Sequence, residues 1–500
     1  MSPRMPLSYA QRRMWFHHQV AVPGPLYNVP LVLRLTGPLD AAALEAAVGD
    51  VVVRHESLRT VFPDVDGDPV QHVLDGPAAR PVLHRRTVTA AELPAVLRRE
   101  VRRTFDLAIN PPLRATLLGV GPDEHVLLVL VHHIATDDWS STPLIRQLSE
   151  AYAARLAGSA PDWEPLPVQY ADYAARQRKV LGDQDDPDSE MAAHLSYWEA
   201  ELAGLPEVIA LPADHPRPAV ASGRGHRVPF GWDGGTQARL VALARETGTT
   251  VFTTVQAVVA ALLTRLGAGT DVPLGAAFSG RTDDSLDDLI GYFSNTLVLR
   301  TDTSGNPTFR ELVLRTRDTN LSAHAHQDCP FDRLVDALKP TRSLSHHPLF
   351  QVMLAYQNAG RNDLSLPGLQ VRVEEVDTGV AKFDLALVFS AHDTAPDAAH
   401  DAAPVSGGRS PGMEGSLHYA TDLFEEASVR AMAERLVRMV RACTADPDRP
   451  VASIGILSAE EHTRLLTEWN NIDGPLADLW AARAPAGPAP AGGGPRTVPS

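Results

Sequence analysis

Six consecutive aliphatic residues, Val126-Leu-Leu-Val-Leu-Val131, limit the fold of this chain more than any other segment. A run of valine and leucine of this length favours a strand, and the lack of any polar side chain in it indicates burial on both faces. Such a strand needs a covering layer on each side, and helical patterns alternate with strand patterns along the chain. The sequence therefore predicts a mixed α/β architecture, in preference to an all-α or all-β fold.

One helix is predicted before this strand in the sequence and one after it. The first spans Asp40–Val53, and its apolar residues recur at helical spacing on one face: Leu44, Ala47, Val48, Val51 and Val52. The second runs from Pro143 to Leu156, with Thr142 as its N-cap and Pro143 as its first residue. Its expected buried stripe consists of Leu144, Ile145, Leu148, Tyr152 and Leu156.

The length of the chain points to more than one lobe. A single core rarely grows beyond about 250–300 residues, and this chain has 500. We expect two lobes, residues 1–177 and 178–470, followed by a linker or disordered tail at 471–500. Three acidic, proline-rich or small-residue stretches are predicted to be linkers or loops: Asp183–Glu190, Leu211–Ser222 and His392–Gly412.

Charge and cysteine content narrow the class of partner and the compartment. With 45 basic and 61 acidic side chains the net charge is −16, which disfavours nucleic acid, because neutralising phosphates needs clustered Lys and Arg. No apolar run approaches the roughly 18 residues of a membrane span, and residues 1–7 hold no apolar signal core. Cys329 and Cys443 lie far apart without metal-site spacing. We expect a cytoplasmic protein with reduced thiols, no membrane contact and no bound metal.

The candidate chemistry lies directly after the aliphatic strand, in His132-His133-Ile134-Ala135-Thr136-Asp137-Asp138-Trp139-Ser140. A strand end holds a reactive group rigidly while the following loop exposes it. A histidine titrates near neutrality and can take a proton from an attacking amine or hydroxyl. Asp137 is close enough to brace the loop or to pair with an arginine from elsewhere. The alternative is that the tandem histidines only hydrogen-bond backbone or water.

Further motifs occur in a fixed order along the chain. They are Pro6-Leu-Ser-Tyr-Ala-Gln-Arg-Arg-Met-Trp15, Arg54-His-Glu-Ser-Leu-Arg-Thr60, the histidine motif, Tyr170-Ala-Asp-Tyr173, Gly280-Arg-Thr-Asp283, Ile290-Gly-Tyr-Phe-Ser-Asn-Thr296, His326-Gln-Asp-Cys-Pro-Phe331 and His347-Pro-Leu-Phe-Gln351. Each motif alone is weak evidence, but the ordered set is very specific. From Pro6 to Asn470 the chain resembles a condensation domain of a nonribosomal peptide synthetase. Tyr27-Asn-Val-Pro30 and Gly37-Pro-Leu-Asp40 are most similar to the subtype that joins two L-residues.

The resemblance implies a fold and a reaction. Two lobes, each resembling chloramphenicol acetyltransferase, would form a V-shaped pseudo-dimer around a central tunnel. Donor and acceptor peptidyl carrier protein domains would dock at the two tunnel mouths and deliver thioesters on phosphopantetheine arms. The chain itself would bind no cofactor. Attack of the acceptor amine on the donor thioester would form a peptide bond, which makes the domain an acyltransferase.

The resemblance also assigns roles to single residues. His133 corresponds to the base or positioner of the attacking amine, and His132 to the first motif histidine, which supports the loop. Asp137 corresponds to a structural aspartate whose usual partner is the arginine at position 281, Arg281. Asn295 corresponds to a residue near the tunnel, although strand and turn packing is the favoured interpretation. Four further histidines are interpreted as lobe and loop residues without a metal: His324, His326, His346 and His347.

One departure from the family pattern affects the site, because Asp138 stands where relatives carry glycine. If its carboxylate faces His133, it raises the pKa of that histidine and weakens a general base. If it faces the following helix, it acts as a cap. Trp139 and Ser140 complete this loop. A smaller departure is His346, where relatives often have arginine.

The alternative function is a non-catalytic condensation-like domain that docks a carrier protein and recruits a tailoring enzyme. Asp138 is its main support. An ester-forming acyltransferase shares the histidine motif, but the plant-type signature Asp-Phe-Gly-Trp-Gly is absent from this sequence. Heterocyclising relatives are disfavoured because that branch has aspartates where this chain has His132 and His133. Epimerising relatives are disfavoured by the residues of the subtype motifs. Leu476–Arg483 resembles the opening of an adenylation domain, so we expect carrier and adenylation partners from outside this chain, whether it is an excised fragment or free-standing.

Overall fold

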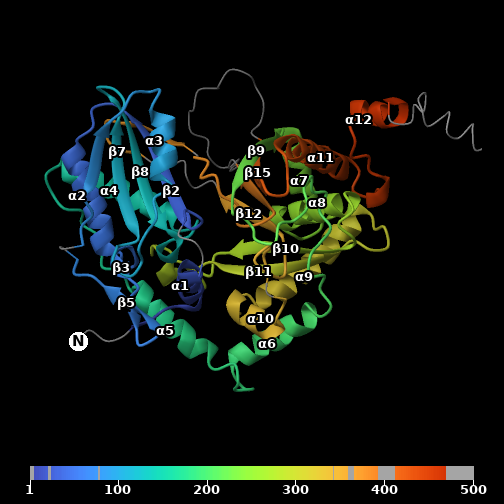
Figure 1. The fold of residues 1–500 in the computed structure, drawn as a ribbon, viewed down its shortest axis with the longest axis horizontal. Coiled ribbons are helices and arrows are strands. Elements are labelled where there is room, and N and C mark those ends of the chain that lie inside the picture. The colour runs from blue at the N-terminus through green and yellow to red at the C-terminus, as the bar shows by residue number, and fades with distance from the viewer. Residues whose placement is uncertain are drawn as a thin grey trace, which may run out of the picture. The chain divides into compact units, whose positions relative to one another are not determined.

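The computed structural model describes residues 5–20, 24–76, 79–341, 343–358, 365–374, 376–391 and 412–468 (Figure 1). The chain divides into two compact units, Met1–Ile454 and Gly455–Ser500. Every described strand lies in the first unit, and the second holds α12 (Ala459–Thr463) and η6 (Arg464–Glu468). The predicted loop from His392 lies outside the described residues except for Gly412, and so does the predicted tail at 471–500.

The aliphatic run forms the centre of a five-stranded sheet with the order β13-β2-β8-β7-β6. Its strands are β2 (Asn28–Thr36), β6 (Leu83–Thr87), β7 (Leu113–Gly119), β8 (Glu124–His132) and β13 (Gln370–Glu374). Strand β8 pairs antiparallel with β2 and β7, and all six aliphatic side chains of the run are buried. The predicted strand is therefore confirmed.

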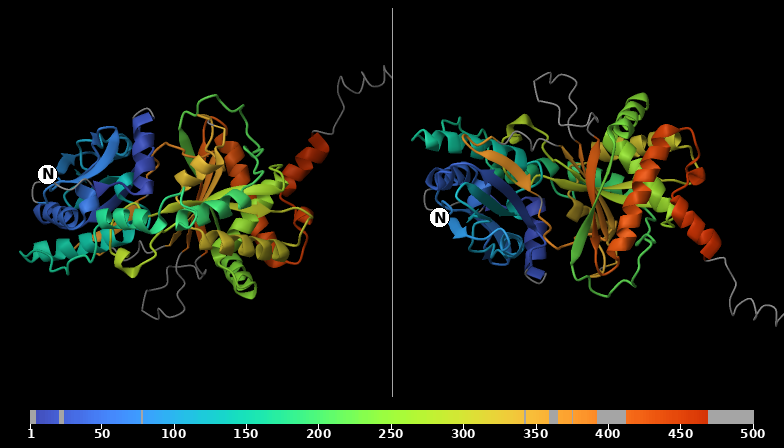
Figure 2. Two further views of the ribbon diagram at one scale, coloured as in Figure 1. Left: turned by 90° about the horizontal axis from the view of Figure 1, so that it is seen from below. Right: turned by 90° about the horizontal axis from the view of Figure 1, so that it is seen from above.

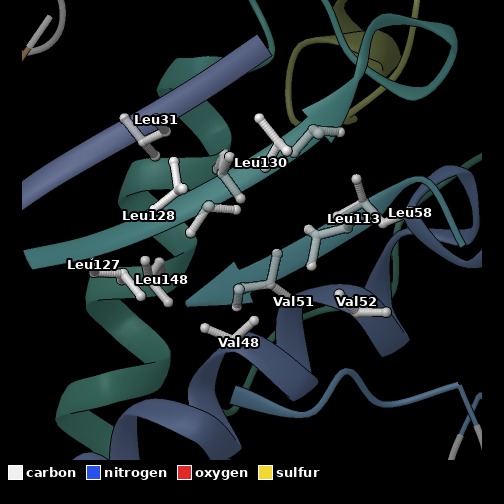
Figure 3. Close-up of a cluster of buried hydrophobic side chains, with 14 of the residues drawn as sticks. Leu31, Val48, Val51, Val52, Leu58, Leu113, Leu127, Leu128, Leu130 and Leu148 are labelled. Carbon is white, nitrogen blue, oxygen red and sulfur yellow. The ribbon is translucent and has the colours of Figure 1, made fainter. Parts of the chain in front are cut away.

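Helices α2 (Ala41–Arg54) and α4 (Ser141–Leu156) pack on this sheet and on each other. Figure 3 shows Val48, Val51 and Val52 of α2 directed at the sheet and Leu148 of α4 beside Leu127. The predicted first helix is confirmed, with Asp40 as an N-cap that accepts hydrogen bonds from two backbone amides. The remaining elements between residues 5 and 181 are β1 (Met5–Pro6), α1 (Tyr9–Val20), η1 (Glu56–Arg59), β3 (Thr60–Val61), β4 (Asp64–Val65), β5 (Asp68–Val73), α3 (Leu93–Glu100), η2 (His133–Ala135) and α5 (Tyr170–Leu181).

The start of α4 differs from the prediction. The helix begins at Ser141 with Ser140 as its N-cap, so Thr142 and Pro143 lie inside its first turn. The Ser140 backbone amide donates to the Asp137 carboxylate at 2.9 Å, and this contact closes the turn before Thr142 is reached. Leu156, predicted to be buried, is 42% exposed, while the other four stripe residues are buried.

The second sheet has six strands in the order β11-β10-β12-β14-β15-β9. They are β9 (Gly225–Trp232), β10 (Asp271–Phe278), β11 (Asn295–Asp302), β12 (Val352–Asn358), β14 (Leu385–Ala391) and β15 (Met413–Ala420). Its helices are α6 (Glu190–Glu201), α7 (Gly234–Glu246), α8 (Val251–Arg265), α9 (Phe309–Ala325), α10 (Phe331–Leu338) and α11 (Glu426–Ala445), with the short turns η3 (Asp284–Leu286) and η5 (Val451–Ser453). The mixed α/β prediction is confirmed, while the V shape and the tunnel stay predictions.

Two segments from later in the chain join the first sheet and its core. Strand β13 pairs antiparallel with β2, and Figure 2 shows this orange strand beside the blue ones. The segment from Leu286 to Phe293 contributes apolar side chains to the core under the first sheet. The predicted lobe boundary between residues 177 and 178 remains a prediction, but the sheet and core of the first lobe draw on residues beyond it.

Among the described helices, none is by itself long and apolar enough to cross a membrane. Helices α7 and α8 reach that composition only when taken together across a bend of 105°. Most side chains of α8 are buried in the second lobe, where the helix packs against α9, α11 and β10.

Candidate functional site

His132 ends strand β8 and is buried. Its Nδ1 accepts a hydrogen bond from the Ile134 backbone amide at 3.2 Å, so the proton of the neutral ring sits on Nε2. Burial lowers the pKa of His132 well below its usual value, and nearby positive or protonatable groups, His18 first among them, add to this shift. His132 is therefore neutral, and its side chain accepts a hydrogen bond from the backbone of the turn that follows it.

His133 begins η2 and is oriented by two hydrogen bonds. Its backbone amide donates to the Tyr27 carbonyl at 2.8 Å, and its Nδ1 lies 2.8 Å from the Thr136 carbonyl oxygen. Because a carbonyl only accepts, Nδ1 carries the proton and Nε2 keeps a free lone pair. The ring packs against Tyr292 with a centroid separation of 4.7 Å and keeps partial solvent access although protein surrounds it.

The electrostatic surroundings keep the His133 imidazole neutral at physiological pH. Burial and the positive charge of Lys382 lower its pKa to about 4, while the Asp138 carboxylate acts in the opposite direction. Asp138 therefore raises the pKa of His133, as expected, but burial and Lys382 together lower that pKa by more.

Asp137 joins the motif loop to a segment far along the chain. Its Oδ2 accepts hydrogen bonds from the backbone amides of Phe293 and Ser294 at 3.0 and 3.1 Å. Its Oδ1 lies 3.4 Å from Arg281 Nη2, so the expected ion pair is present, with side chains 1% and 6% exposed. Burial raises the pKa of Asp137, and the Arg281 guanidinium opposes that rise. These contacts tie the motif loop to the backbone at Phe293 and Ser294 and to Arg281.

The Ser140 hydroxyl is the centre of the same network. Its Oγ lies 2.7 Å from Asp137 Oδ1, 2.9 Å from the Gly291 carbonyl oxygen and 3.0 Å from Arg281 Nη2. With one hydrogen it donates to either the carboxylate or the carbonyl, and it accepts from Arg281. A Cβ at Gly291 would come within 2.2 Å of the Tyr170 ring, so only glycine permits this close approach. Trp139, the preceding residue, is half-buried.

Asp138 is exposed, and its carboxylate makes no hydrogen bond to the first turn of α4 among the described residues. Its charge acts on His133 and Lys382 instead. Asp138 does not have a positive φ, so the backbone at this position does not require a glycine. Of the two arrangements considered from the sequence, the capping contact is absent among the described residues, and the carboxylate acts on His133 through its charge.

Asn295 lies at the first position of β11 and anchors the loop before α10. Its Nδ2 donates to the carbonyls of Gln327 and Cys329 at 2.7 and 2.6 Å, and its Oδ1 accepts from the Phe331 amide at 3.2 Å. This loop lines a cavity of about 400 Å³. The cavity is also lined by Tyr9, Arg13, Tyr173, Tyr292 and Asp332. These contacts support the packing interpretation of Asn295.

Sequence reasoning missed Lys382 entirely. Its Nζ lies 5.0 Å from the centroid of the Tyr27 ring, and burial lowers its pKa to about 8 against the opposing effect of Asp138. The side chain nevertheless reaches solvent. One signal was available, because the chain has only three lysines among its 45 basic residues. An ammonium, unlike a guanidinium, changes its charge readily when its surroundings change.

The loop histidines do not gather around one point. His326 lies 3.1 Å from His194, measured between the Nδ1 atoms, whereas Nε2 of His347 lies 3.5 Å from Arg13 Nη2. The described residues contain no group of three or more His, Cys, Asp or Glu side chains in a metal-binding arrangement. Both cysteines are buried and free, and burial raises the pKa of Cys329 to about 12.

Comparison with known proteins places this site in a family context. The family model for the condensation domain matches residues 1–466. A dimodular nonribosomal peptide synthase of Bacillus subtilis is 48% identical over 94% of this chain, which covers 19% of that protein. The probable non-canonical nonribosomal peptide synthetase CymA of Salinispora arenicola is 51% identical over 92% of this chain, which covers 6% of that protein. The chain thus spans a fifth or less of these relatives.

Solved structures agree with this match. The X-domain from teicoplanin biosynthesis is 36% identical with a TM-score of 0.82, covering 91% of this chain and 98% of that domain. The same X-domain has also been solved in complex with OxyB. The condensation domain of the Monacolin K polyketide synthase MokA, 22% identical with a TM-score of 0.75 over 90% of this chain and 99% of that one, shares the fold.

Proposed function

Because the chain belongs to the condensation-domain family, we propose that it forms peptide bonds between two carrier-bound substrates in nonribosomal peptide synthesis. The observation that carries this proposal is the state of the His133 ring. Its Nδ1 is engaged with the Thr136 carbonyl, its Nε2 lone pair is free, and the ring is accessible. A substrate amine can therefore donate a hydrogen bond to Nε2.

The proposed reaction is an acyl transfer that conserves atoms and charge. The lone pair of the acceptor amine attacks the donor thioester carbonyl carbon and forms the new C–N bond. The tetrahedral intermediate then expels the thiolate as the C–S bond breaks. The amine nitrogen gives up one proton and the departing sulfur takes one up, so protons are conserved, while Nε2 of His133 accepts a hydrogen bond from the amine. The product remains a thioester on the acceptor arm.

The low basicity of His133 favours positioning over full proton abstraction. A pKa of about 4 makes the ring a weak base, since general bases work best when their pKa lies near the operating pH. A neutral imidazole still accepts a hydrogen bond and holds the amine in line with the thioester carbon, which is a proximity effect. His133 thus acts chiefly by orienting the amine.

Carrier and adenylation domains supply the substrates in this proposal, and no cofactor binds to the chain itself. Tyr292 both packs on the His133 ring and lines the cavity of about 400 Å³. A cavity of this size suits a small, largely apolar ligand chain. We assign this cavity to one of the two phosphopantetheine-tethered groups, which would approach His133 past Tyr292.

A dipeptide-formation assay tests the proposal. Aminoacylated donor and acceptor carrier proteins are mixed with the wild type, with His133→Ala and with His125→Ala. The dipeptide is then cleaved from the acceptor carrier and quantified by mass spectrometry. His125 is the matched control because it lies near the other end of β8. The proposal expects product from the wild type and His125→Ala and a loss of about 10²-fold or more in His133→Ala. Equal rates in all three would overturn it.

A second candidate function has a specific observation in its favour. The X-domain that was solved in complex with OxyB is 36% identical to this chain over 92% of this chain's length. In this case the chain would dock a carrier and recruit a tailoring enzyme without forming a bond. The same assay separates the two functions, because a platform binds carrier protein but yields no product in either the wild type or His133→Ala.

A further inference from the structure

Tyr292 is a buried tyrosine whose hydroxyl has no hydrogen-bond partner in the described part of the chain. The residue is 9% exposed, and it is its backbone carbonyl, not its hydroxyl, that takes part in a hydrogen bond. Tyr170, which is 1% exposed, shows the usual arrangement, because its hydroxyl lies 2.9 Å from Ser8 Oγ. A buried hydroxyl without a partner is costly, so the hydroxyl of Tyr292 needs a reason.

The side chain of Tyr292 contacts both the His133 ring and the cavity of about 400 Å³. Its ring packs on the imidazole with a centroid separation of 4.7 Å and an angle of 58° between the two planes. Tyr292 also lines the cavity. Its hydroxyl is not one of the sealed, unpartnered polar atoms of the described residues, so it keeps accessible surface. A molecule in the cavity can therefore meet an uncommitted donor beside His133.

The backbone around Tyr292 is fixed by side chains from two other elements. The Tyr292 carbonyl accepts a hydrogen bond from the Tyr170 hydroxyl on α5. The amide of the next residue, Phe293, donates to the Asp137 carboxylate at 3.0 Å. The motif loop that carries His133 thus also holds the backbone of Tyr292, so the imidazole and the phenol are positioned by one hydrogen-bonded unit.

Two stronger donors on the cavity wall are already engaged. The guanidinium of Arg13 has its Nε 3.3 Å from Asp332 Oδ1 and its Nη2 3.5 Å from His347 Nε2. The amide of Asn295 donates to two carbonyls of the loop before α10. Neither group is as free as the Tyr292 hydroxyl to donate to a substrate oxygen.

Two further tyrosines line the same cavity but have other neighbours. The Tyr173 hydroxyl lies 3.1 Å from a side-chain amide of the next turn of α5. The Tyr9 ring packs against the guanidinium groups of Arg178 and Arg333, which lie 4.7 and 5.2 Å from its centroid. Tyr292 differs from both because its ring packs on the imidazole of the histidine motif.

We propose that Tyr292 is a further catalytic residue, whose hydroxyl donates a hydrogen bond to the carbonyl oxygen of the donor thioester while the acceptor amine attacks. The inference deepens the proposed function and rests on it, because that function places the amine on the His133 ring. The carbonyl that this amine attacks then lies beside the same ring, where Tyr292 is packed.

The reaction itself creates the need for such a donor. As the C–N bond forms, the π electrons of the thioester carbonyl move onto its oxygen, and they return when the C–S bond breaks. A fixed donor beside this oxygen stabilises the charge that develops there and lowers the barrier. The phenol keeps its proton throughout, so the balance of protons is unchanged. Burial raises the pKa of Tyr292 to about 12, and the side chain is therefore a neutral donor at physiological pH.

Kinetics of the Tyr292→Phe variant test the inference, because this change removes only the hydroxyl and keeps the ring on His133. Rates of dipeptide formation measured against the concentration of acceptor carrier give kcat and KM. We expect kcat to fall about 10²-fold with KM nearly unchanged, as for a bond that strengthens in the transition state. The melting temperature should not fall, since the hydroxyl has no protein partner to lose. A folded variant with the wild-type kcat, or with a change in KM alone, overturns the inference.

Two further variants separate the hydroxyl from the ring. Tyr197→Phe is the matched control, because it also removes an unpartnered hydroxyl, on α6 and outside the cavity lining, and it should leave kcat unchanged. Tyr292→Ala removes the ring together with the hydroxyl and should be at least as slow as Tyr292→Phe. If Tyr292→Phe matches the wild type and Tyr292→Ala alone is slow, the ring acts only by packing and the inference is wrong.

Infrared spectroscopy supplies a readout that needs no turnover. The donor carrier is loaded with an amino acid that is ¹³C-labelled at the thioester carbonyl, and difference spectra are recorded with the wild type and with Tyr292→Phe in the absence of acceptor. A hydrogen bond to the carbonyl lowers its stretching frequency, so the band should lie lower with the wild type. A wild type that forms no dipeptide refutes the proposed function. In that case a lower band with the wild type still supports the bond from Tyr292, and identical bands overturn it.

Discussion

The Nδ1 atom of His133 and the carbonyl oxygen of Thr136 lie 2.8 Å apart, and this contact decides which ring nitrogen can meet a substrate. The carbonyl can only accept, so the proton of the neutral ring stays on Nδ1. The neighbouring His132 has the opposite arrangement, since its Nδ1 accepts from the Ile134 amide. Two adjacent histidines are therefore fixed in different tautomers by the backbone of one short turn.

This difference in tautomers is open to direct measurement. In ¹⁵N-labelled protein at pH 7, His133 should show a protonated Nδ1 and an unprotonated Nε2, and His132 the reverse. Signals are assigned with His133→Gln and His132→Gln. A His133 ring protonated on Nε2 would contradict the assignment and would remove the free lone pair from the site.

Removal of Arg281 should destabilise the protein strongly. Arg281→Ala leaves the Asp137 carboxylate buried beside an empty space, which typically costs about 3–5 kcal/mol of unfolding free energy. The matched control is Arg176→Ala, which breaks an exposed pair with Asp283 and should cost about 1 kcal/mol or less. Urea denaturation of the three proteins measures both values. Equal midpoints for the two variants would argue against the role assigned to the buried pair.

Asn295 should be important for the loop that lines the cavity of about 400 Å³. Asn295→Ala removes two donated hydrogen bonds and one accepted bond to residues 327–331, which we expect to cost about 2 kcal/mol. Limited proteolysis should then cut within this loop sooner than in the wild type. Asn320→Ala, which removes side-chain amide bonds between α8 and α9, serves as control and should leave the loop protected. Unchanged cleavage in Asn295→Ala would show that packing alone holds the loop.

Stability should decline as the pH falls below about 6.5. Burial lowers the pKa of His17, His55 and His133 to about 4 and that of His347 to about 3. Between these values and 6.5 the unfolded chain binds protons that the folded protein does not, so acid favours unfolding.

Carboxyl groups whose pKa is raised by burial act in the opposite direction but do not cancel this trend. Burial raises the pKa of Asp332 to about 6 and also raises the pKa of Asp137 and Glu201, so these groups take up protons more readily in the folded state and stabilise it in acid. We expect the four histidines, whose pKa values are lowered to about 3 or 4, to outweigh these carboxyl groups. Melting temperatures measured from pH 7 to 4.5 should therefore fall, and the exposed His84→Gln variant should follow the same curve. A flat profile would show that these rings are protonated in the native state.

Replacing Asp138 by glycine should preserve or raise the rate of dipeptide formation. The change removes the carboxylate that raises the pKa of His133 and leaves burial and Lys382 to keep the ring neutral. Initial rates at pH 6 and 7.5 are compared with the wild type. A collapse of the rate in a folded Asp138→Gly protein would mean that the aspartate has acquired a role of its own.

The sequence alone determined the elements whose information is local. The aliphatic run at 126–131 is a central buried strand, and the apolar spacing over 40–53 is a helix, because side-chain periodicity depends only on near neighbours. The ordered motifs indicated the family, and through it the partner of Asp137. The prediction was less accurate for the start of α4, where the turn is closed by the contact between Ser140 and Asp137.

Only the tertiary structure decided how distant segments complete the site. It brought Lys382 over the Tyr27 ring, placed the backbone of Phe293 on Asp137 and added β13 to the edge of the first sheet. None of these contacts leaves a periodic pattern, because each joins residues more than a hundred positions apart. The charge state of His133 follows from the same contacts, since burial and through-space fields depend on the packed arrangement and not on neighbouring residues in the chain.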